Sequence, residues 1–148
     1  MNRLLILLMA LLFAGCSSHK TLDLKTFSME MPKQWHYKSL PGFDDLSGII
    51  VKGQSQDSVV LTFDYSAKGY ANNLKHITDS NAKAYNIRID STDRYVVRTV
   101  WPKVAGKGTT GIHYKGSTSR FAFSVAGYNL IKKDQELALA AFKTIVIK

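Results

Sequence analysis

Cysteine and proline are scarce in this chain of 148 residues, which contains one cysteine and three prolines. Because a single cysteine cannot form an intramolecular disulfide, the fold must depend on its hydrophobic core. Apolar residues make up 45% of the chain, which is enough for such a core and excludes disorder beyond a short segment. The apolar run from Leu4 to Phe13 is shorter than the about 20 residues needed to span a bilayer, so a membrane-spanning helix is not expected.

The cysteine, Cys16, follows a segment with the features of a secretory signal. Arg3 supplies a positive start, an apolar run follows, and the small residues Ala14 and Gly15 precede the cysteine. This segment resembles the signals of bacterial lipoproteins, although Phe13 stands where those signals usually carry Leu. The resemblance implies diacylglyceryl transfer to the Cys16 thiol and cleavage between Gly15 and Cys16.

The expected organisation is a signal peptide over residues 1–15, a lipidated tether over residues 16–24 and a single domain over residues 25–148. Several acyl chains anchor a protein stably to a membrane, whereas one chain binds only marginally. Ser17 follows the cysteine, where retention at the inner membrane typically uses Asp. We therefore expect a cell-envelope protein at the outer membrane, facing the periplasm, rather than at the inner membrane. The alternative is an ordinary secreted protein with one free thiol.

The chain is basic, with a formal net charge of +9 at pH 7. Nucleic acid is not an expected partner outside the cytoplasm, and the charges are spread along the chain, which favours a solvated surface over contact with anionic lipid or acidic glycan. The densest basic group consists of Lys103, Lys107, Lys115 and Arg120, with His113 among them.

Hydrophobic periodicity predicts an α+β fold, with a mostly antiparallel sheet flanked by helices. Helical spacing appears over residues 70–85 and again from Asp134, a residue suited to an N-cap, to Ile145. Trp35 and Trp101 are expected to close opposite ends of the sheet as core residues. Alternation with a period of two predicts strands over residues 27–31, 47–52, 58–65, 86–91, 94–101, 109–115 and 119–128.

No set of residues has the spacing of a catalytic or metal site. Asp44, Asp45 and Asp57 are interpreted as turn formers. The four histidines show no ligand spacing with one another or with a carboxylate: His19, His36, His76 and His113. We therefore expect no catalytic residue, no metal and no cofactor; a hydrolase that uses Asp44, Asp45 or His113 is the weakest alternative.

The two ends of the expected domain carry a family resemblance. Phe27-Ser-Met-Glu-Met-Pro-Lys-Gln-Trp35 and Ala141-Phe-Lys-Thr-Ile145 resemble the start and end of PsbP-like domains. That superfamily includes the photosystem II extrinsic protein, a Ran-binding nuclear import factor and DcrB-like bacterial lipoproteins. The resemblance spans about residues 25–148 and implies an αβα sandwich that binds or stabilises larger partners. No site residue transfers with it.

These observations predict a membrane-anchored envelope lipoprotein that acts as a non-catalytic binding or assembly module for an envelope protein complex. The alternative is a ligand-carrying lipoprotein that holds a lipid, a glycan fragment or a small molecule between sheet and helix. The aromatic residues and the basic turn near Lys103–Lys107 motivate that alternative.

Overall fold

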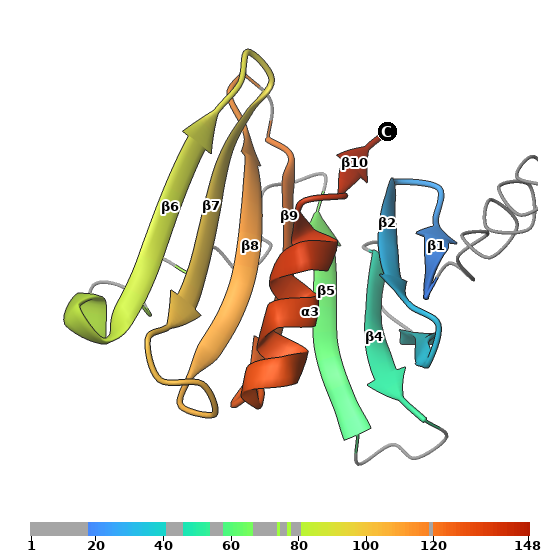
Figure 1. Ribbon diagram of the computed structural model, residues 1–148. Coiled ribbons are helices and arrows are strands. Elements are labelled where there is room, and N and C mark those ends of the chain that lie inside the picture. The colour runs from blue at the N-terminus through green and yellow to red at the C-terminus, as the bar shows by residue number, and fades with distance from the viewer. Residues whose placement is uncertain are drawn as a thin grey trace, which may run out of the picture.

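The computed structural model describes residues 18–40, 46–53, 58–66, 74, 77, 81–118 and 120–148 (Figure 1). Within these residues the chain forms two antiparallel sheets and one α-helix, α3 (Lys132–Phe142). The larger sheet has seven strands in the order β3-β4-β5-β9-β8-β7-β6, and the smaller has three in the order β1-β2-β10. The strands are β1 (His19–Asp23), β2 (Phe27–Pro32), β3 (Trp35–Leu40), β4 (Leu46–Lys52), β5 (Val59–Ser66), β6 (Tyr85–Ser91), β7 (Tyr95–Pro102), β8 (Thr109–Gly116), β9 (Ala122–Tyr128) and β10 (Val146–Ile147).

The seven-stranded sheet consists of two meanders. Strands β3, β4 and β5 pair in chain order, and so do β6, β7, β8 and β9. The meanders are joined by the antiparallel pair β5–β9, whose register runs from Thr62 opposite Ala126 to Ser66 opposite Ala122. Because side chains alternate along each strand, this register gives the whole sheet two continuous faces. We call the face that carries Phe63, Phe123 and Val125 the inner face, and the opposite face the outer face.

The inner face is covered by the three-stranded sheet and by α3, which lie side by side over it (Figure 1). Phe27 of β2 is fully buried, and its ring lies 4.6 Å from that of Phe123 and 5.2 Å from that of Phe63, measured between ring centroids. Helix α3 buries the small residues Ala138 and Ala141, which allow the helix to approach the sheet closely. The core therefore lies between the seven-stranded sheet and a mixed layer of strand and helix.

The prediction of an α+β sandwich with helices flanking the sheet was wrong. The described residues are mostly strand, and part of the layer expected to be helical is the three-stranded sheet. The strands that were missed show no hydrophobic alternation: β1 has one buried residue, Leu22, and β10 has only two residues. Their conformation is therefore decided by pairing with β2. Strand β1 also lies within the segment expected to be a tether, 16–24.

The helix predicted over residues 70–85 falls mostly outside the described residues. Within it, Ala82–Ala84 form a short 3-10 helix. Leu74 is fully buried and packs with Val100 and Ala126, which lie on the outer face of the sheet.

The two tryptophans have different environments. Trp35, at the start of β3, is fully buried in the main core, as predicted. Trp101, near the end of β7, is only half-buried. The prediction that Trp101 is a core residue that closes the end of the sheet was therefore wrong.

Candidate functional site: a groove beside helix α3

A groove lies on the inner face, beyond the edge of α3. Strands β7 and β6 extend past the covering layer (Figure 1), so this layer covers the inner face of β7 only in part: Val97 packs against the main core, and Gln135 of α3 bonds to Pro102 at the end of the strand. The resulting cavity has a volume of about 550 Å³ and is open to solvent. This volume is within the range of about 300–1,000 Å³ that is typical of small-molecule sites.

The floor of the groove follows from the alternation of β7. Val97, Thr99 and Trp101 lie on the same face of this strand, as their spacing predicts, and β8 adds Ile112 and Tyr114 beside them. These five side chains form a largely apolar floor with two hydroxyl groups. The opposite wall is the side of α3, which contributes Leu139, Phe142 and Lys143.

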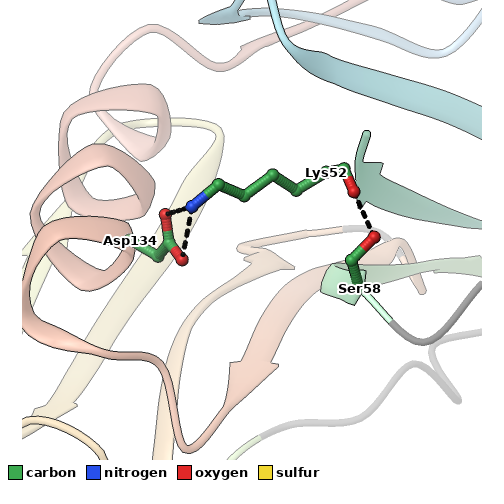
Figure 2. Close-up of polar contacts among 3 residues, drawn as sticks. All are labelled: Lys52, Ser58 and Asp134. Atoms are coloured by element: carbon green, nitrogen blue, oxygen red, sulfur yellow. Dashed lines mark hydrogen bonds and ion pairs between the residues drawn. The ribbon is translucent and has the colours of Figure 1, made fainter. Parts of the chain in front are cut away.

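Helix α3 is held in place by polar contacts at its first turn. The Lys52 ammonium group, at the end of β4, donates to both carboxylate oxygens of Asp134 at 3.0 and 3.2 Å (Figure 2). The backbone carbonyl of the same lysine accepts a hydrogen bond from the Ser58 hydroxyl (Figure 2). On the other side, the buried Gln135 side chain donates to the Pro102 carbonyl at 3.1 Å. The helix begins at Lys132, so Asp134 is not the expected N-cap; its carboxylate instead ties the helix to the sheet.

The far end of α3 is tied to the three-stranded sheet. The Thr144 hydroxyl donates to the Ala141 carbonyl at 2.7 Å and accepts a hydrogen bond from the Glu30 amide at 2.8 Å. The helical wall of the groove is thus fixed at both ends, which favours a preformed site over one that must assemble around a ligand.

The rim of the groove carries charge. Arg88 and Asp90 lie on the inner face of β6, and the Arg88 Nε atom donates to the Asp90 carboxylate at 2.6 Å. Lys143 stands on the opposite rim. The two cations and one carboxylate leave the rim with a net positive charge, which favours an anionic group in the ligand.

Tyr114 provides a neutral hydroxyl group on the floor. Burial, together with the negative charge of Asp90, raises its pKa from 10.0 to about 12. The hydroxyl therefore remains protonated at physiological pH and can donate a hydrogen bond to a ligand.

Sequence reasoning missed the rim of the groove. Arg88 and Asp90 lie within the strand predicted over residues 86–91 but were not singled out, and Lys143 appeared only within the terminal motif that ends at Ile145. One signal was available, because Arg88-Ile-Asp90 places two opposite charges on one face of a strand. Nothing in the sequence indicated that this face would lie opposite α3, since that depends on the order of strands in the sheet.

The histidine predicted as a possible catalytic group lies on the other face. His113 is buried on the outer face of β8, opposite Arg98 of β7 and Ser124 of β9, and Ser124 in turn lies opposite Asp64 of β5. A catalytic triad needs an imidazole between hydroxyl and carboxylate. Here the serine stands between the histidine and the aspartate, so this row does not have the order of a triad.

The other predicted residues are not brought together. His19 and His36 are exposed on β1 and β3. Outside the described residues lie Gly15, Cys16, Asp44, Asp45, Asp57 and His76. Among the described residues, no group of three or more His, Cys, Asp or Glu side chains is placed to hold a metal ion.

The predicted basic group is divided between the two ends of β8. Lys103 and Lys107 lie in the connection between β7 and β8, whereas Lys115 and Arg120 lie at the far end of β8 and in the connection to β9. The strand between these pairs is about 20–25 Å long at about 3.3 Å per residue. These basic residues are close in sequence but do not form one group in space, because the extended strand separates the two pairs.

No protein-family model matches this chain, and no curated protein matches it. In the part of the chain that the structure describes, no helix is both long and apolar enough to cross a membrane.

Proposed function

We propose that this chain is a lipid-anchored binding protein of the bacterial envelope, and that the groove beside α3 holds an amphiphilic ligand. The observation that carries the proposal is the groove itself, which combines an apolar floor with a cationic rim. Such sites are typically lined by apolar side chains with a few polar groups that orient the ligand. A molecule with an apolar body and an anionic head fits this arrangement.

The apolar body would lie along Trp101 and Ile112, against the side of Phe142. The anionic head would lie at the rim, between Arg88 and Lys143, and the Tyr114 hydroxyl would donate a hydrogen bond between the two regions. The role is non-catalytic: the groove binds and orients, and the expected acylation of Cys16 keeps the ligand near a membrane.

Native mass spectrometry of the full chain, released gently from envelopes of its host, tests this proposal. We expect a non-covalent mass increment that disappears under denaturing conditions, whereas the covalent lipid of the anchor remains. Val97→Trp fills the floor of the groove and should remove the increment. Val96→Trp places the same ring on the outer face of the same strand and should leave the increment unchanged. The same non-covalent increment in all three proteins, or no increment in any of them, would contradict ligand binding in the groove.

The assembly function expected from the sequence is the second candidate. The specific observation in its favour is the edge strand β6, which pairs only with β7 among the described residues and exposes apolar side chains. An envelope protein partner would be bound there, apart from the floor of the groove.

A further inference from the structure

Strand β6 forms one edge of the seven-stranded sheet (Figure 1) and pairs only with β7 among the described residues. At one end the Ala84 carbonyl accepts from the Lys103 amide at 2.9 Å, and at the other the Thr92 amide donates to the Tyr95 carbonyl at 2.8 Å. The even-numbered residues of β6 therefore direct their backbone groups toward β7. The odd-numbered residues, including Ile87 and Ile89, direct theirs away from the sheet.

This edge lacks several of the features that usually prevent strands from pairing with other molecules. Natural edges are protected by proline, by charged side chains, especially lysine, by bulges, by short length or by a covering segment. Strand β6 has no proline, lysine or bulge, and its two charged residues, Arg88 and Asp90, are of opposite sign. Strand β6 has seven residues, Tyr-Asn-Ile-Arg-Ile-Asp-Ser, and pairs with β7 in an unbroken register. Two of its apolar side chains are exposed on the outer face, Ile87 at 39% and Ile89 at 60%. The edge is thus suited to accept another strand.

We propose that β6 pairs in antiparallel orientation with β6 of a second copy of this chain, centred on Ile89. In this register Ile89 lies opposite Ile89 of the partner subunit, and both can exchange backbone hydrogen bonds. Arg88 lies opposite Asp90 of the partner subunit, and the same pair recurs on the other side of the two-fold axis. The contact between Arg88 and Asp90 within one strand is then replaced by two ion pairs between strands.

The charges of Arg88 and Asp90 favour this register over the neighbouring registers. Pairing centred on Arg88 would place two arginines directly opposite one another, which is unfavourable. Pairing centred on Ile87 would place Arg88 opposite Asn86 and form no ion pair. Only the register centred on Ile89 matches both charges and places apolar side chains together on the outer face.

The proposed interface also joins the two grooves. Arg88 and Asp90 lie on the inner face of β6 and form part of the groove rim. In the dimer, the rim of each groove would gain an arginine and a carboxylate from the partner subunit, which leaves its net charge unchanged. The second copy would thereby complete one side of the site.

Cysteine cross-linking of the full chain in its native envelope tests the register. Opposed residues in an antiparallel pair have Cα atoms about 5.5 Å apart, which suits a disulfide. We expect Ile89→Cys to give a disulfide-linked dimer after mild oxidation, at several times the yield of two controls. One control is Ile87→Cys, which lies on the same edge but away from the two-fold axis. The other is Val96→Cys, which is exposed on the outer face of the neighbouring strand β7. Equal yields at all three positions, or a higher yield at Ile87, would overturn the proposal.

Charge reversal tests the ion pairs independently. In the Ile89→Cys background, Arg88→Asp and Asp90→Arg should each lower the dimer yield several-fold, because each places like charges opposite one another. The double variant restores opposite charges and should recover the original yield. Both residues are exposed on the strand, so these changes leave the core intact. Failure of the double variant to recover the dimer, with each single variant impaired, would overturn the assigned pairing.

Discussion

Replacement of Phe27 tests whether the three-stranded sheet is an integral part of the core. The side chain is fully buried and packs against the rings of Phe63 and Phe123 on the larger sheet. Phe27→Ala removes a ring that contacts the larger sheet through two aromatic pairs. Substitutions of buried phenylalanine by alanine cost about 3–5 kcal/mol, because a cavity is added to the lost transfer free energy.

A second substitution separates the contribution of the two ring pairs from that of the side-chain volume. Phe27→Leu keeps most of the side-chain volume and loses the two ring pairs, each of which contributes about 0.5–1.5 kcal/mol beyond burial. We therefore expect a loss of about 1–3 kcal/mol for Phe27→Leu and about 3–5 kcal/mol for Phe27→Ala. A domain of this size has a free energy of unfolding of about 5–15 kcal/mol, so both losses are large enough to measure.

Urea unfolding followed by circular dichroism provides the assay, with the dependence of free energy on urea compared between variants. Val146→Ala is the matched control, since Val146 lies in the same small sheet but is 59% exposed. It should change the free energy of unfolding by less than about 0.5 kcal/mol. A loss below about 1.5 kcal/mol for Phe27→Ala would refute the reasoning, because it would show that the small sheet can detach without opening the core.

Three further predictions follow from other sites. Gly48→Ala should lower the free energy of unfolding by about 1–3 kcal/mol in the same urea assay, because an added Cβ would lie 2.5 Å from the Phe63 ring; a neutral effect would contradict this packing. Because folding raises the pKa of Tyr114, the folded state loses stability as the pH rises from 10 toward 12. After allowance for solvent screening this loss is about 1–2 kcal/mol; Tyr114→Phe should remove it, and identical pH profiles of the free energy of unfolding would count against it. Cys16→Ser should release the protein from membranes or leave an uncleaved precursor, and unchanged membrane fractionation would argue against lipidation.

Local sequence features account for the individual strands better than for their assembly. Alternation placed Val97, Thr99 and Trp101 on one face of β7, and the register agrees. Alternation could not reveal what covers that face, since a half-buried strand has the same pattern under a helix, under a second sheet or beside a groove. For this reason Trp101 was assigned to the core, although it lines the groove.

The mixed covering layer was missed for a related reason. Strand β1 has the sequence His-Lys-Thr-Leu-Asp, in which one buried leucine carries no periodic signal. Its conformation is decided by five residue pairs with β2, and β10 is decided by two more. Strands that depend on a partner for their hydrogen bonds are less visible in sequence than helices, whose hydrogen bonds are local.

The sequence by itself determined the absence of any internal disulfide and the alternating faces of the longer strands, because these depend on residue type and on local backbone period. The anchor at Cys16 stays a prediction. Only the tertiary structure decided that β9 returns to pair with β5, that α3 covers β7 only in part, and that Arg88 and Lys143 line the same groove. These features depend on contacts between segments far apart in the chain, and no local pattern encodes which face of a strand is left uncovered.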